Sequence, residues 1–167
     1  FVMEGNKKEE AIPSMPDIKR QSIDLIIDTA RECFKLGIPA IALFPVIDAK
    51  LKTEDAKEAY NPEGLIPRVV ALLKQHVPQL GVITDVALDP YTSHGQDGLI
   101  DASGYVLNDE TVEILINEVD VSGGTGSNFI FEWRSPQNVS EPLFEAIMTS
   151  TKGQQGISFT TQAVRIQ

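Results

Sequence analysis

Three aspartates and one histidine follow a short apolar segment near the middle of the chain. Asp85, Asp89 and Asp97 lie four and eight positions apart, and His94 lies between the last two. Carboxylate oxygens are ligands that a hard divalent cation such as Mg²⁺ prefers, and they also attract a cationic group of a substrate. The alternative is a solvated turn in which each carboxylate bonds nearby backbone amides. The residue types alone leave both interpretations open.

The segment before these aspartates predicts a buried strand. Val82, Ile83 and Val86 are β-branched and belong to a mostly apolar run over residues 80–88, a pattern typical of strands buried on both faces of a parallel sheet. Pro90 ends the strand because proline has no backbone N–H to donate. The polar loop that follows contains two glycines, which leave its backbone free to fold over a ligand.

Strand and helix patterns alternate in front of this segment. Residues 1–4 indicate the end of a strand, and residues 12–20, with two prolines, indicate an irregular connection. Apolar positions at helical spacing then predict a helix with Ser22 as its N-cap and Gly37 as its stop. Residues 40–46 predict a second buried strand.

A second helix is expected to begin near Leu65, because Pro67 suits only the first turn of a helix. A third is expected after Asn108, with the apolar face Val112, Leu115, Ile116 and Val119. This alternation predicts an α/β fold, in which a site lies at the C-terminal ends of the strands. The aspartates follow the third strand, so their position agrees with their chemistry.

The aspartate-rich run TDVALDPYTSHGQDGLID resembles the metal-loop signature of the porphobilinogen synthase (5-aminolevulinate dehydratase) family. Further blocks resemble that family in a fitting order: FVMEG, IPSMPDIKRQSID, LGIPAIALFPV, NPEGLIPR and GYVLNDETVEIL. Together they cover residues 1–118. The resemblance implies a partial (β/α)8 TIM barrel, the first three βα units of eight, followed by an irregular tail over residues 119–167 that does not match the family.

The resemblance also implies an activity. Family members condense two 5-aminolevulinate molecules to porphobilinogen with loss of water in tetrapyrrole (heme) biosynthesis, through Schiff bases on two lysines. A desolvated lysine amine attacks ketones and then serves as an electron sink. Neither lysine block is found here, and Lys152 is interpreted as a surface lysine. The chain is therefore expected to be an incomplete, inactive fragment of this lyase, and its start at Phe1 agrees with that.

Site residues follow from the same resemblance. Asp85 corresponds to the aspartate that orients the substrate amine, while Tyr91, Ser93 and His94 belong to the lid. Zinc-dependent members place three cysteines at the positions of Ala87, Asp89 and Asp97. Carboxylates in place of thiolates disfavour zinc and imply the Mg²⁺- or K⁺-responsive branch, with Asp89 and Asp97 on the metal. The family also implies a homo-octamer.

The tail leaves several interpretations open. SGGTGSN at residues 122–128 is interpreted as a linker, because no Walker lysine follows it to support phosphate binding. Residues 129–133 and 157–166 are expected to pair as strands, and the tail as a whole to be frame-shifted or disordered. Two alternatives to a dehydratase remain: a non-catalytic metal-binding or interaction remnant of the family, and another barrel lyase with a carboxylate-bound metal.

Composition narrows the class of protein. A net charge of −10 disfavours nucleic acid and anionic membranes as partners. Apolar and charged fractions of 42% and 23% are those of a globular domain, and no apolar run is long enough to span a membrane. Cys33 is the single cysteine, which excludes an internal disulfide and a cysteine zinc cluster. A cytoplasmic protein is expected.

Overall fold

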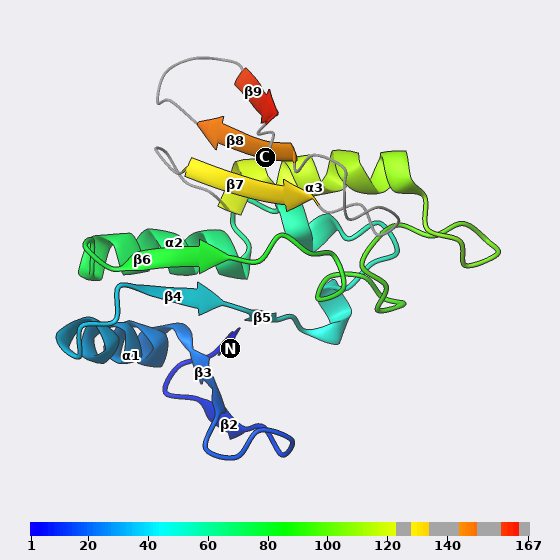
Figure 1. Cartoon of the computed structure of the whole chain (residues 1–167). Helices are drawn as coiled ribbons and strands as arrows, with labels where there is room; N and C mark the ends of the chain where they lie inside the picture. Colours follow the sequence, from blue (N-terminus) through cyan, green and yellow to red (C-terminus); the bar gives the residue numbers. More distant parts are fainter. Residues whose placement is uncertain (123–127, 134–143, 150–157, 164–167) are drawn as a thin grey trace. The chain divides into compact units, whose positions relative to one another are not determined.

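The computed structural model describes residues 1–122, 128–133, 144–149 and 158–163. It divides the chain into two units, Phe1–Ser122 and Gly123–Gln167. The sequence analysis places this boundary after Glu118, four residues earlier. The first unit has a mixed α/β fold (Figure 1).

Parallel strands form the centre of the first unit. β1 (Val2–Met3) lies between β3 (Lys19–Ser22) and β5 (Pro45–Val46) and is parallel to both. β4 (Ala40–Leu43) is separated from β5 by Phe44 alone and pairs in parallel with β6 (Gly81–Thr84). The predicted strand over residues 80–88 is therefore shorter than expected. Pro45 has no backbone N–H to donate to a neighbouring strand, which is consistent with the break between β4 and β5.

The N-terminal part contains a hairpin that the sequence analysis missed. β2 (Glu9–Ala11) pairs antiparallel with β3, although residues 12–20 were expected to be irregular. The prolines at Pro13 and Pro16 fall in the connection between the two strands, where they remove no ladder hydrogen bond. β2 is thus a charged edge strand, and charge on an edge opposes pairing with other chains.

Three helices follow the predicted positions. α1 (Ile23–Lys35) begins after Ser22, α2 (Leu65–His76) after Gly64, and α3 (Asn108–Ser122) at Asn108. Short 3₁₀ turns, η1 (Ala49–Leu51) and η2 (Lys57–Tyr60), lie between β5 and α2. Ser22 occupies the N-cap position of α1 without a side-chain cap bond. Its hydroxyl instead donates to Asp24 at 2.6 Å and accepts from the Lys8 N–H at 3.0 Å.

The main core lies between the parallel strands and the first two helices. Ile26, Ile27 and Ala30 of α1 pack with Val69 and Leu73 of α2 in one buried cluster, and Ile41, Leu43 and Val82 reach it from the strands. Figure 1 shows β4 and β6 side by side with both helices next to them. Burial of each large aliphatic side chain contributes about 1.5–3 kcal/mol, so this cluster is the main source of stability of the unit.

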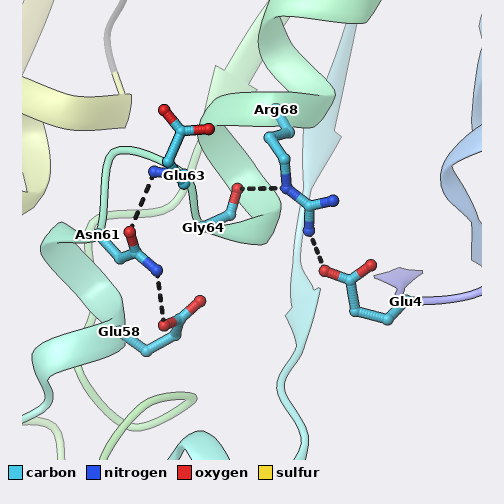
Figure 2. Close-up of polar contacts among 6 residues, drawn as sticks. All are labelled: Glu4, Glu58, Asn61, Glu63, Gly64 and Arg68. Carbon is cyan, nitrogen blue, oxygen red and sulfur yellow. Dashed lines mark hydrogen bonds and ion pairs between the residues drawn. The ribbon is translucent and has the colours of Figure 1, made fainter.

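A polar network fixes the start of α2 (Figure 2). The Asn61 side-chain amide donates to Glu58 at 3.0 Å, and the Arg68 Nε donates to the Gly64 carbonyl at 3.2 Å. Arg68 also forms an ion pair with Glu4, directly after β1. A Cβ at Gly64 would lie 2.8 Å from the Asn61 carbonyl oxygen, so only glycine fits this N-cap. The network ties the first turn of α2 to the end of β1.

The second unit contains three antiparallel strands: β7 (Asn128–Trp133), β8 (Phe144–Thr149) and β9 (Ser158–Ala163). β8 lies in the middle and pairs with both others. Residues 129–133 and 157–166 were expected to pair as strands. β7 and β9 lie in these ranges, and each pairs with β8, an intervening strand that the sequence analysis did not predict. Ser122 and Asn128, the ends of the predicted glycine-rich linker, belong to α3 and β7, whereas residues 123–127 of that linker and Lys152 lie outside the described residues.

Candidate active site

Asp85 directly follows β6, whose last residue, Thr84, pairs with Leu43 of β4. β4 and β6 are parallel, so Asp85 stands at the carboxyl edge of the sheet. In α/β folds this edge is where ligands bind, because loops of several strands converge there. The strand therefore places Asp85 where the sequence analysis expected it.

The three aspartates act on one another electrostatically. Burial raises the pKa of Asp85, and the negative charges of Asp89 and Asp97 raise it further. Like charges raise the pKa of a carboxyl group in this way over distances of roughly 8–10 Å in physiological salt. The structure thus brings the three predicted side chains into one acidic cluster, and a positive charge entering it would relieve the repulsion.

Asp97 also has a structural role. Its Oδ1 accepts a hydrogen bond of 2.7 Å from the Leu88 backbone N–H, nine residues earlier. The loop is thereby closed back onto the residue before Asp89. This contact is the local amide bond that the solvated-turn interpretation predicted, so one oxygen of Asp97 holds the loop in place.

The residues predicted to form a lid lie in different environments. Tyr91 is buried in a second apolar cluster with Ala56, Ala59 and Leu88, and burial, followed by the charge of Glu118, raises its pKa. Ser93 is exposed, and its N–H donates to the Thr53 carbonyl at 3.0 Å. Tyr91 therefore anchors the start of the loop.

His94 lies farther along the same loop. Its Nδ1 accepts from the Gln96 backbone N–H at 3.2 Å, while its Nε2 is buried without a hydrogen-bond partner among the described residues. Nδ1 therefore bonds the imidazole to the loop, whereas Nε2, on the other edge of the ring, has no partner among the described residues. A buried polar atom of this kind is stabilised when it gains a partner.

Glu118 of α3 belongs to the acidic cluster, and the sequence analysis did not find it. Its side chain is 2% exposed, and its Oε2 has no hydrogen-bond partner among the described residues. Burial raises the pKa of Glu118 to about 8, helped by the charges of Asp85, Asp97 and Asp89 and opposed by a hydrogen bond from the Ala87 backbone. Glu118 consequently holds a proton near neutral pH.

Glu118 was missed because the apolar face predicted for α3 did not include its position. Val112 was assigned to the buried face but is 45% exposed, whereas Thr111 and Glu118 are buried. Positions 111, 114, 115, 118 and 119 have the i, i+3, i+4, i+7, i+8 spacing of a buried helix face. That spacing was the signal available in the sequence. It was not recognised because two of the five positions, Thr111 and Glu118, are polar.

These residues do not form a preorganised metal-binding site. In the part of the chain that the structure describes, no group of three or more His, Cys, Asp or Glu side chains is arranged to hold a metal ion. Asp89 and Asp97 together provide hard oxygen donors, and Cys33 lies away from them in α1. Mg²⁺ is held in many proteins by one or two carboxylates and several waters, so two aspartates suit that ion, whereas zinc sites in proteins usually include His or Cys ligands.

Comparison with known proteins identifies the family. The family model for delta-aminolevulinic acid dehydratase matches residues 1–132. The chain belongs to the delta-aminolevulinic acid dehydratase family. The match continues past residue 118, where the sequence analysis ended it, so residues 119–132 also match the family.

No helix of the described residues is long and apolar enough to cross a membrane.

Individual dehydratases agree with this assignment. The enzyme of Bradyrhizobium diazoefficiens is 47% identical over 130 residues, which are 78% of this chain and 36% of that protein. The dehydratase of Bacillus subtilis is 33% identical over 147 residues, 88% of this chain and 43% of that protein. The crystal structure of the Toxoplasma gondii dehydratase (porphobilinogen synthase), in complex with its product porphobilinogen, matches with a TM-score of 0.71 and 41% identity, over 73% of this chain and 35% of that one. The chain thus spans less than half of these relatives.

Proposed function

We propose that the protein is part of a porphobilinogen synthase, the lyase that condenses two 5-aminolevulinate molecules to porphobilinogen with loss of water in tetrapyrrole (heme) biosynthesis. The main support is the 47% identity with the Bradyrhizobium diazoefficiens dehydratase. In this proposal the unit Phe1–Ser122 supplies the first three βα units of a TIM barrel. The parallel β1, β5, β4 and β6 with α1 and α2 agree with that assignment.

Asp85 is the residue with the clearest chemical role. 5-Aminolevulinate has an ammonium group, and the acidic cluster favours a cation because Asp85, Asp89 and Asp97 repel one another. Asp85 would orient this ammonium group at the sheet edge and exchange its proton, since a carboxyl with a raised pKa is a better acid–base group at neutral pH. Ser93 and His94 would cover the bound molecule and exclude water.

Asp89 and Asp97 would hold hydrated Mg²⁺, with K⁺ as the alternative. The support is the hard donor set and the lack of a thiolate beside it. A bound cation would supply positive charge that offsets the carboxylates. Titration calorimetry with MgCl₂ tests this, with Asp89→Asn as the variant. No Mg²⁺ binding to the folded wild-type chain, or Mg²⁺ binding unchanged in Asp89→Asn, would refute the assignment.

A chimera tests the proposed reaction. Residues 1–132 of this chain would replace the matching segment of the Bradyrhizobium diazoefficiens dehydratase, and pyrrole formation from 5-aminolevulinate would be followed with an aldehyde reagent. We expect pyrrole from the chimera and a loss of about 10²-fold or more in Asp85→Asn, the usual effect of removing an acid–base group. Asp28→Asn, at a side chain 71% exposed on α1, is the matched control. A folded chimera that forms no pyrrole would refute the proposed function.

A non-catalytic binding remnant of the family is the second candidate. The observation in its favour is that the chain covers 36% of its Bradyrhizobium relative. The chimera distinguishes the two, because the rest of the enzyme supplies the lysines that this chain lacks. A chimera that is folded but forms no pyrrole would favour the remnant. The homo-octamer and the cytoplasmic location remain proposals that rest on the family.

A further inference from the structure

The backbone of residues 85–89 is held by two carboxyl groups from other parts of the chain. This segment belongs to neither a helix nor a strand, so no regular ladder fixes it. Asp97, later in the loop, accepts the Leu88 N–H at 2.7 Å. Glu118 of α3 accepts a hydrogen bond from the backbone of Ala87, the preceding residue. The two carboxyl groups therefore fix the segment that carries two of the predicted site aspartates.

The packing of α3 keeps Glu118 behind this segment. Ile114 and Leu115, one helical turn before Glu118, pack against the buried cluster that contains Leu88 and Tyr91. Positions three and four residues apart share one face of a helix, so Glu118 faces the same part of the loop. Its side chain is 2% exposed and thus has no free path into solvent. α3 consequently carries this carboxyl group to a fixed place.

Among the aspartates, Asp85 has the strongest electrostatic effect on Glu118. Burial is the largest cause of the raised pKa of Glu118, and Asp85 raises that pKa more than Asp97 or Asp89 does. The coupling between two charges weakens with distance, so Glu118 lies beside Asp85. A protonated Glu118 adds no charge there near neutral pH. It therefore offers the loop a hydrogen-bond acceptor without repelling the carboxylate that it supports.

A buried acid at this position is unfavourable for stability. The Oε2 atom of Glu118 has no hydrogen-bond partner among the described residues, and a buried polar atom without a partner destabilises a fold. A leucine would fill the same space, and apolar replacements of buried charged groups often leave stability unchanged or raise it. Proteins keep such groups mainly at functional sites, where stability is given up for activity. The burial of Glu118 thus indicates a role in the site.

We propose that Glu118 is a positioning residue of the dehydratase site, which holds the Ala87 backbone and thereby fixes Asp85 against the ammonium group of the substrate. Glu118 acts through Asp85 and not on the substrate itself. The placement matters because a displacement of about 1 Å in a reacting group can lower a rate by about 10²-fold. This inference rests on the role of Asp85 in the proposed function.

Hydrogen exchange tests the hold on the backbone. The exchange rate of the Ala87 amide is measured by NMR in the full chain and in the variants Glu118→Leu and Glu118→Gln. Leucine fills the space but accepts no hydrogen bond, whereas glutamine keeps a carbonyl oxygen. Glu113→Leu is the matched control, because Glu113 is exposed on the same helix. The amide of Val69, a core residue of α2, reports any general loss of stability.

The Ala87 amide should exchange about tenfold faster or more in Glu118→Leu, since it loses its acceptor, and at the wild-type rate in the other two variants. The Val69 amide should be unaffected in all of them. Equal exchange of the Ala87 amide in the wild type and Glu118→Leu would overturn the proposal.

The kinetics of the chimera test the consequence for the reaction. We compare kcat/KM for pyrrole formation at pH 7 with the midpoint of urea unfolding, because a purely structural residue would change both together. In Glu118→Leu, kcat/KM should fall about tenfold or more while the urea midpoint stays the same or rises. Glu118→Gln should recover most of the lost activity, and Glu113→Leu should match the wild type. Full activity in Glu118→Leu, or an equal loss in Glu118→Gln, would overturn the proposal.

The outcome for the proposed function is read separately. A wild-type chimera that forms no pyrrole counts against the dehydratase activity, and the exchange of the Ala87 amide then decides alone whether Glu118 holds the loop. An active wild-type chimera, combined with unchanged exchange and unchanged kcat/KM in Glu118→Leu, supports the activity and overturns the positioning role.

Discussion

Glu118→Gln is the sharpest test of the acidic cluster. The ordinary pKa of a glutamate is 4.5, and burial among Asp85, Asp97 and Asp89 raises the pKa of Glu118 to about 8. A raised pKa means that folding favours the protonated acid. The contribution of Glu118 is therefore fully present below pH 4.5 and is lost as the pH rises through 8. Glutamine has no proton to lose, so the variant lacks this dependence.

The size of the effect follows from the shift. One pKa unit corresponds to about 1.4 kcal/mol, so the difference between 4.5 and about 8 corresponds to a maximum of roughly 5 kcal/mol. A domain of this size is stabilised by about 5–15 kcal/mol in total. The wild-type free energy of unfolding is therefore expected to fall by several kcal/mol between pH 4.5 and pH 8. In Glu118→Gln most of that decline is absent.

This pH dependence of the free energy of unfolding is measured by urea unfolding at a series of pH values, monitored by circular dichroism. Glu113→Gln is the matched control, because Glu113 is exposed on the same helix, and it should keep the wild-type dependence. The raised pKa of Asp85 acts in the same direction and remains in both variants. Equal slopes for the wild type and Glu118→Gln between pH 4.5 and 8 would refute the assignment of a buried, protonated Glu118.

Three further substitutions test the packing and the loop, each by urea unfolding. Leu73→Ala, at a side chain 0% exposed in α2, is expected to cost about 2–5 kcal/mol, and a cost below 1 kcal/mol would contradict the core described above. Asp97→Ala leaves the Leu88 N–H without its 2.7 Å partner and is expected to cost about 1–3 kcal/mol, whereas Asp97→Asn, which keeps an acceptor, should cost less. Equal costs for these two would show that the bond is unimportant. Gly64→Ala forces a Cβ against the Asn61 carbonyl oxygen at 2.8 Å and is expected to destabilise the protein, and an unchanged midpoint would contradict this geometry.

The helices could be predicted because their signals are local. Ser22, Gly64 and Asn108 stand at the starts of α1, α2 and α3, as their sequence context indicates. Apolar spacing within ten to fifteen residues was sufficient for these elements. The hairpin of β2 and β3 was missed because its strands are polar and short, so no alternation of apolar residues marks them.

The candidate site was predictable in part for the same reason. Asp85, Asp89 and Asp97 lie within thirteen residues after an apolar strand, so residue type and spacing indicated them. Glu118 could not be selected in this way, because glutamate in a helix is usually exposed. Its burial depends on contacts with residues some thirty positions earlier in the chain. Tertiary packing, and not local pattern, makes it part of the cluster.

The repulsion within the acidic cluster can be relieved in two ways, by a proton on one carboxyl group or by a bound cation. The charges of Asp89 and Asp97 raise the pKa of Asp85, and all three aspartates raise that of Glu118, so it is costly to charge the four carboxyl groups together. Glu118, the most deeply buried of the four, has a pKa of about 8 and so favours its protonated form near neutral pH, whereas the side chains of Asp85, Asp89 and Asp97 are exposed. A cation or ammonium group at the sheet edge would meet those exposed carboxylates first. The proton on the buried acid behind them lowers the repulsion within the cluster, so four neighbouring carboxyl groups are compatible with a stable fold.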